Sequence, residues 1–200
     1  MSNYFPSESE AKQQAIDRAN RLLANVGTNL QELGNKRRVL DLGAGQGELQ
    51  EGALVLGFNN VISFDLRARQ TGMGAMGNAR ELPLSDNSID LIICRAGPIP
   101  MASSEQNAKL AIAESNRALT ADGEIRVYPA FFRFIYDQVW KKNLPDDTHQ
   151  EPKNDLIAKV AKEHQQEINQ HSAAFLESLG YKDFIKKNQA GEDYWQLPKL

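Results

Sequence analysis

The residues best suited to chemistry form a strand end followed by a glycine-rich turn: Asp41, Gly43, Ala44, Gly45 and Gly47. Glycine permits a tight turn and lets a ligand approach the backbone where a Cβ atom would clash. A helix is expected to begin at Glu48, and its N-terminus offers unpaired N–H groups and partial positive charge. These features suit a carboxylate or a phosphate. The stretch therefore predicts a ligand-binding loop at the carboxyl end of a strand, with Asp41 either in the site or only capping the turn.

A dinucleotide is the first candidate for such a loop, and its site requires the spacing G-x-G-x-x-G. Gly43 and Gly45 fit this spacing, but Glu48 takes the place of the third glycine. Its carboxylate would lie near the pyrophosphate and repel it. The chain instead has the spacing D-x-G-x-G-x-G, in which an acid precedes three more closely spaced glycines. This pattern disfavours a dinucleotide-dependent oxidoreductase.

A second acid, Asp65, ends the next apolar run and is followed by Leu66. In parallel α/β sheets, ligands bind beyond the carboxyl ends of the strands, near the point where the strand order reverses. A carboxylate at this edge can accept hydrogen bonds from both hydroxyls of a ribose. We prefer this role for Asp65 to that of a solvated acid at a strand end. It indicates a nucleoside, which dinucleotides also contain.

The stretch from Gly77 to Asp90 reads G-N-A-R-E-L-P-L-S-D-N-S-I-D. It resembles the G-D-A-x-x-L-P-F-x-D-x-S-F-D stretch of the type 11 family of class I S-adenosylmethionine-dependent methyltransferases. The glycine loop likewise resembles motif I of that class, and the resemblance covers about residues 37–128. It implies S-adenosylmethionine as the cofactor. The residue at the position of Asn78 binds the adenine amino group in this family, and the N–H at the position of Ala79 contacts the ring.

Alternating strands and helices must position these residues. Apolar runs predict strands over 38–42, 61–64, 75–77, 89–94 and 124–128, the last entered by a turn at Asp122-Gly123. Helical spacing predicts a helix from the capping-box pair Ser7 and Glu10 to Val26, and further helices over 48–56 and 108–119. A late helix is expected between Asn154 and Gly180, followed by a hairpin turning at Ala190-Gly191. The fold class is therefore α/β, a doubly wound, mostly parallel sheet with a C-terminal antiparallel hairpin.

The 200 residues suit a single methyltransferase domain. We divide it into an N-terminal helical cap (1–36), a cofactor-binding core (37–128), a candidate lid (129–153), and the last helix and strand pair (154–200). The lid hypothesis rests on the aromatic side chains between Phe131 and Trp140, which would equally suit a buried core helix. Between Asp65 and Asn78 the segment is short and rich in glycine, so no regular helix is expected there.

Composition excludes several other classes. The formal net charge is −3, which favours no nucleic-acid partner. The lone cysteine, Cys94, lies in an apolar run and is expected to be a buried hydrophobe. No Cys/His spacing typical of a zinc site occurs, so no metal is expected. No apolar run is long enough to span a membrane, and the polar start resembles no signal peptide. The expected location is the cytoplasm.

The expected reaction is direct displacement of a methyl group from S-adenosylmethionine by a small, partly apolar molecule. No catalytic residue is identified, because the stretch from Arg95 to Pro100 carries no known catalytic signature. Arg95 could pair with the cofactor carboxylate or a substrate anion, or form a surface ion pair. Tyr128 is a candidate base by position alone. His164 and His171 share a helix face and are expected to pack at the edge of the core. Protein or RNA methylation, and a non-catalytic regulatory or partner role, stay open.

Overall fold

Seven strands form one sheet in the order β3-β2-β1-β4-β5-β7-β6 among residues 6–66, 74–143 and 163–200, which the computed structural model describes. Five are parallel: β1 (Val39–Leu42), β2 (Val61–Asp65), β3 (Ala75–Met76), β4 (Ile89–Arg95) and β5 (Leu119–Tyr128). The last two, β7 (Asp193–Pro198) and β6 (Ile185–Lys187), run antiparallel along the β5 edge. The predicted fold class is confirmed, as is the hairpin, whose turn contains Gly191 at φ +80°.

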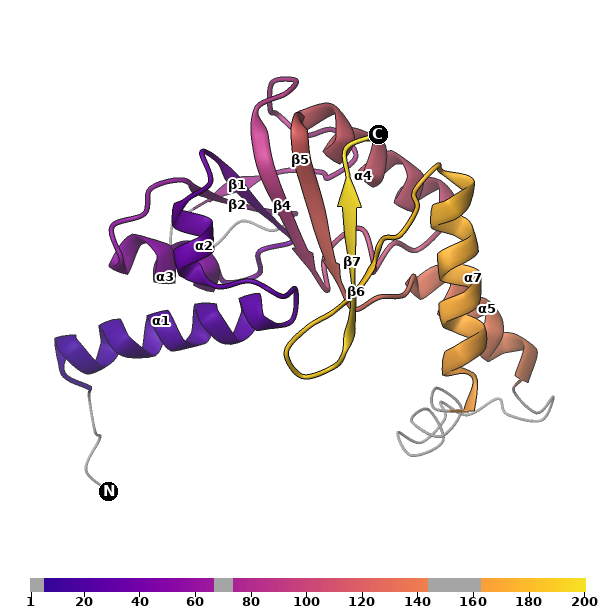
Figure 1. Ribbon diagram of the computed structural model, residues 1–200, viewed down its shortest axis with the longest axis horizontal. Helices are drawn as coiled ribbons and strands as arrows, with labels where there is room; N and C mark the ends of the chain where they lie inside the picture. Colours follow the sequence, from indigo (N-terminus) through magenta and orange to yellow (C-terminus); the bar gives the residue numbers. More distant parts are fainter. Residues whose placement is uncertain (1–5, 67–73, 144–162) are drawn as a thin grey trace.

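Helices cover both faces of this sheet (Figure 1). One layer consists of α1 (Glu8–Ala24), α2 (Leu30–Gly34) and α3 (Glu48–Val55), and the other of α4 (Glu105–Ala118), α5 (Arg133–Asn143) and α7 (Gln165–Ser178). Side chains alternate between the layers along each strand. Leu91 and Ile93 of β4 belong to the first core, while Ile92 and Cys94 belong to the second. Because both faces are covered, the central strands β1, β2 and β4 are mostly apolar and buried along their length.

The N-terminal helix begins where the capping box predicts. The Ser7 hydroxyl accepts a bond from the Glu10 N–H at 3.3 Å, and the Glu10 carboxylate accepts one from the Ser7 N–H at 2.7 Å. This helix packs tightly against α3, since a Cβ atom on Gly52 would lie only 2.4 Å from the Cβ of Ala19. The first layer is thereby held firmly behind the glycine loop.

The predicted turn at Asp122-Gly123 is wrong, because β5 begins at Leu119 and passes through both residues. The register explains the difference. Ile89 pairs with Leu119 but Leu91 pairs with Glu124, so the extra residues of β5 are accommodated in an irregularity of the strand. Of the predicted late helix, α7 is present and ends before Gly180, at φ +99°. Its expected beginning near Asn154 lies outside the described residues, as does the rest of the candidate lid beyond Asn143.

Candidate cofactor site

A cavity of about 500 Å³ opens at the carboxyl ends of β1, β2 and β4. The strand order reverses at β1, which lies between β2 and β4, so the cavity occupies the place where doubly wound sheets bind ligands. Its walls come from four separate segments: Leu42, Gly43, Phe64, Asp65, Leu66, Gly77, Asn78, Ala79, Ala96, Gly97, Pro98 and Met101. Five of these, Gly43, Asp65, Leu66, Asn78 and Ala79, are cofactor-binding residues predicted from the sequence.

The glycine loop follows β1 and is hydrogen-bonded to the end of β2. The N–H groups of Gly43 and Ala44 both donate to the Phe64 carbonyl, at 2.8 and 3.1 Å. Gly43 has φ +84°, and a Cβ atom there would lie 2.6 Å from the Cα of Gly97. No other residue type fits this position without moving backbone, so the glycine is required by close approach as well as by conformation. Gly47, at φ +79°, then precedes α3.

Asp65 connects the end of β2 to the glycine loop. One of its carboxylate oxygens, Oδ2, accepts the Gly45 N–H at 2.9 Å. The side chain is partly exposed and lines the cavity, with the more exposed Leu66 beside it. A carboxylate that receives a loop N–H is held in one orientation, which suits it to receive further donors from a ligand. The position is the one expected for a ribose-binding acid.

Asn78 and Ala79, which follow β3, line the cavity next to the end of β2. The Asn78 oxygen Oδ1 accepts two bonds from Arg80, one from its backbone N–H at 3.0 Å and one from Nε at 3.1 Å. An amide oxygen has two lone pairs. To accept an adenine amino group, this oxygen would have to exchange one of its two bonds from Arg80 for a bond from the base. Arg80 also donates to Asn107 Oδ1 of α4 at 3.0 Å, which fixes its own position.

The fourth segment, 96–101, was missed by the sequence analysis. Ala96 has the left-handed φ of +47°, unusual for a residue other than glycine, and its N–H donates to the Tyr128 carbonyl at 2.6 Å. A Cβ atom on Gly97 would lie 2.4 Å from the Leu42 carbonyl oxygen, so this segment packs directly on the end of β1. The expected pairing of β1 with β4 could have pointed to this segment, because residues that follow adjacent parallel strands meet at one edge of the sheet.

Several predicted site residues do not line the cavity. Asp41 is buried behind the glycine loop, 7% exposed, where its charge contributes to raising the pKa of Cys94. Arg95 pairs with Tyr128 across neighbouring strands, and neither reaches the cavity lining. Ala44, Gly45 and Gly47 shape the loop from outside that lining. The binding roles of these residues stay predictions.

The candidate base Tyr128 is poorly suited to proton removal, and the described His and Cys side chains differ in their burial. The Tyr128 hydroxyl donates to Glu192 Oε2 at 3.2 Å, and burial followed by the Glu192 charge raises its pKa. His164 is partly buried and bonds Glu167 Oε2 at 3.2 Å, beside the start of α7. His171 is exposed on α7, so the prediction that it packs at the core edge is wrong. Cys94 is fully buried, and burial raises the pKa of its thiol to about 12.

Comparison with known proteins agrees with this geometry. Residues 40–127 match the sequence profile of the type 11 methyltransferase family, described as "Methyltransferase domain". Over these residues the chain is similar to the class I S-adenosylmethionine-dependent methyltransferases, which agrees with the resemblance noted in the sequence. The family binds S-adenosylmethionine. No curated protein sequence matches this chain.

Solved structures share the fold of this chain at low sequence identity. A Methanococcus maripaludis protein assigned to the S-adenosyl-L-methionine-dependent methyltransferases is 16% identical, with a TM-score of 0.51, over 100% of this chain and 96% of that one. Human N-acetylserotonin methyltransferase, crystallised with S-adenosylmethionine, is 16% identical, with a TM-score of 0.52, over 96% of this chain and 56% of that one. The chain spans 61% of the PH0226 protein of Pyrococcus horikoshii, at 17% identity and a TM-score of 0.45.

The residues at the cavity fit the family's cofactor. No atom lies within 4 Å of where a Cβ atom of Gly45 would be, so the glycine loop has open space above it. The cavity volume falls within the range of about 300–1,000 Å³ usual for small-ligand sites. The acid at the end of β2 and the amide at Asn78 supply polar groups from two adjacent strand ends. None of the helices in residues 6–66, 74–143 and 163–200 is long and apolar enough to cross a membrane.

Proposed function

We propose that the protein transfers a methyl group from S-adenosylmethionine to a small, partly apolar molecule by direct displacement. The observation that carries this proposal is the division of the cavity into a polar and an apolar side. Asp65 ends β2 and Asn78 follows β3, both on one side of β1. Pro98 and Met101 follow β4, on the other side of β1. A cavity of this kind orients a polar cofactor by a few groups and accepts a mainly apolar molecule beside it.

Each polar group has a definite task in this proposal. Asp65 would accept the ribose hydroxyls while the Gly45 N–H holds its orientation. Asn78 and Ala79 would contact the adenine, and the glycine loop would receive the amino-acid half of the cofactor. When bound, the cofactor supplies a methyl group on a positively charged sulfur, which is already strongly electrophilic. The protein therefore has mainly to align the acceptor and exclude water.

The apolar side supports an apolar acceptor. The segment 96–101 is held against α5, because the Arg133 N–H donates to the Pro100 carbonyl at 2.8 Å. Behind it, Phe131 lies 6.0 Å from Tyr136 between ring centroids, and Tyr136 stacks on Trp140 at 6.2 Å. These three rings are partly buried, so they add apolar surface to the element that holds segment 96–101.

No general base is assigned. Asp65 is the single titratable side chain in the cavity lining of the described residues. This absence of a base suits an acceptor that reacts without prior proton removal. It equally favours the second candidate, a non-catalytic protein that binds S-adenosylmethionine and acts as a partner or regulator. Methylation of protein or RNA is the remaining alternative; the net charge of −3 disfavours RNA.

Calorimetric titration followed by an activity screen tests the proposal. We expect micromolar binding of S-adenosylmethionine and S-adenosylhomocysteine, no comparable binding of NAD, and turnover with a set of small apolar amines, phenols and thiols. Binding without turnover of small molecules, protein or RNA would favour the non-catalytic candidate. Turnover of polypeptide or RNA alone would overturn the small-molecule assignment. The cytoplasm stays the proposed compartment, because the lone cysteine is buried and suits a reducing environment.

A further inference from the structure

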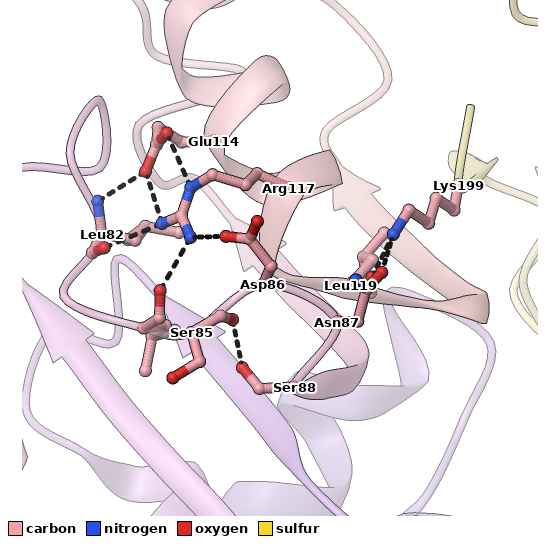
Figure 2. A network of polar contacts seen from close by, with 10 residues as sticks. Leu82, Ser85, Asp86, Asn87, Ser88, Glu114, Arg117, Leu119 and Lys199 are labelled. Atoms are coloured by element: carbon pink, nitrogen blue, oxygen red, sulfur yellow. Dashed lines mark hydrogen bonds and ion pairs between the residues drawn. The ribbon is translucent and has the colours of Figure 1, made fainter.

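The segment 78–88, which begins with the predicted adenine-contacting residues, has no regular secondary structure and is held by one side of α4. Figure 2 shows the central contact, the guanidinium of Arg117. Its Nη1 donates to the Leu84 carbonyl at 2.8 Å and to Asp86 Oδ1 at 2.6 Å. Its Nη2 donates to the Leu82 carbonyl at 3.0 Å. A single side chain thus binds the segment at three successive points.

Glu114, one turn earlier on α4, orients this guanidinium. Its two oxygens accept bonds from Arg117 Nε at 3.0 Å and Nη2 at 2.9 Å, a bidentate pair. The same carboxylate accepts the Leu82 N–H at 3.0 Å, so both backbone polar groups of Leu82 are bound by the pair. The hydrogen bond from Arg117 lowers the pKa of Glu114, so the carboxylate stays charged near neutral pH.

The far end of the segment is tied to the same helix end. The Asn87 N–H donates to the Arg117 carbonyl at 3.1 Å, and the Ser88 N–H donates to the Ala118 carbonyl at 2.8 Å. Leu82 is 4% exposed, so its side chain anchors the middle of the segment in the core. The segment is therefore fixed from Leu82 to Ser88, and this fixed part leads directly back to the cavity wall at Ala79.

We propose that Arg117, oriented by Glu114, is a positioning residue for recognition of the adenine base. Arg117 itself does not line the cavity. It acts by holding segment 78–88, so that Asn78 and Ala79 stay in a fixed position relative to the base. This inference rests on the proposed function, since it assumes an adenine in the cavity. Binding groups must be held within about 0.5 Å of their productive positions by supporting contacts of this type.

A matched arginine elsewhere in the fold provides the control. Arg126 Nε bonds Glu124 Oε1 at 2.7 Å, and its Nη1 donates to the carbonyls of Val26 and Gly27 at 3.3 and 3.2 Å. It therefore joins a carboxylate to two backbone carbonyls, as Arg117 does, but on the α1 side of the sheet. Arg117→Lys and Arg126→Lys each keep the charge and lose the planar fork.

The experiment compares the affinities of S-adenosylhomocysteine and S-inosylhomocysteine, which differ at the position of the adenine amino group. In the unchanged protein we expect a clear preference for the adenine compound. Arg117→Lys should reduce that preference about tenfold, or about 1.4 kcal/mol. Arg126→Lys should lower the melting temperature and leave the preference unchanged. If Arg117→Lys does not fold, Glu114→Gln removes the orienting charge at nearly the same side-chain size.

Hydrogen exchange supplies a reading that needs no ligand. Amides of residues 79–82 and 84 should exchange faster in Arg117→Lys than in Arg126→Lys. Equal exchange in the two variants, or an unchanged base preference in Arg117→Lys, overturns the positioning role. Failure of the unchanged protein to bind either compound overturns the proposed function instead, and the exchange result still decides whether Arg117 holds the segment.

Discussion

The two sides of the cavity are built from different materials. The ribose side consists of the glycine loop and Asp65. The Asp65 carboxylate accepts a hydrogen bond directly from the Gly45 N–H of this loop. The acceptor side consists of segment 96–101, in which Ala96, Gly97, Pro98 and Met101 contribute backbone and apolar surface. Polar chemistry is thus concentrated on the side predicted to bind cofactor. The side predicted to meet the acceptor offers shape, and its specificity must come from packing.

The two sides of the cavity nevertheless pack directly against each other. Gly43 and Gly97 approach so closely that neither could carry a Cβ atom without displacing the other strand end. Behind Gly97 lies the buried Cys94, and beyond segment 96–101 the aromatic residues of α5 continue the acceptor side into the core. Changes in the acceptor side should therefore act through packing and stability, and changes in the ribose side through affinity.

The largest expected effect is the loss of stability in Phe132→Ala. Phe132 is fully buried, with ring centroids 4.8 Å from Phe175 and 4.7 Å from Trp195. Removing the ring should cost about 3–5 kcal/mol of the free energy of unfolding, because it leaves a cavity in the core. Trp140→Ala is the control, since this ring is only partly buried and should cost much less. Urea denaturation measures both.

The comparison between Phe132 and Trp140 also separates the core part of the aromatic segment 131–140 from a part that could act as a lid. The segment was predicted to be either a lid or a core helix, and Phe132 and Phe134 belong to the core. A lid role is left for the part that includes Tyr136 and Trp140. If Trp140→Ala proved as destabilising as Phe132→Ala and did not alter acceptor turnover, the whole described segment would be core.

A smaller effect is expected from Asp65→Ala on the ribose side. Removing a carboxylate that accepts charge-assisted bonds should cost about 1.5–3 kcal/mol of binding free energy for S-adenosylhomocysteine. The melting temperature should change little, because the side chain is partly exposed. Asp17→Ala is the control: this exposed acid of α1 is not part of the cavity lining and accepts a bond from Gln13 Nε2 at 2.8 Å. Unchanged affinity in Asp65→Ala would remove the ribose assignment.

The smallest effect on stability at neutral pH is expected from the ionisation of the Cys94 thiol. Burial raises the pKa of its thiol from 9.0 to about 12, so the folded protein keeps this proton where the unfolded chain loses it. The resulting stabilisation is complete below pH 9 and is lost as the pH rises from 9 towards 12. At pH 8 the native thiol should not react with iodoacetamide, whereas the thiol of the urea-unfolded chain should. Rapid alkylation of the native protein, followed by mass spectrometry, would contradict the buried position behind the acceptor side.

Local sequence was sufficient to predict the glycine loop, an acid at the end of β2 and most elements. Three glycines after an apolar run, an acid at the end of the next run, and a capping box at Ser7 each express a rule that operates within a few residues. The late hairpin follows equally from a local turn at Gly191. These features could be predicted because their physical causes, backbone conformation and unpaired N–H groups, are contained in the segment itself.

Tertiary structure alone decided which strand ends share the cavity and what each side chain bonds there. Segment 96–101 joins the site because β4 pairs with β1, and Asp122-Gly123 lies within β5 because the pairing with β4 continues past an irregularity. Arg80 bonds Asn107 of α4, and Arg117 holds segment 78–88 from a helix about 30 residues later in the chain. Such contacts depend on the free energy of packing the whole sheet. The type and spacing of neighbouring residues therefore do not encode them.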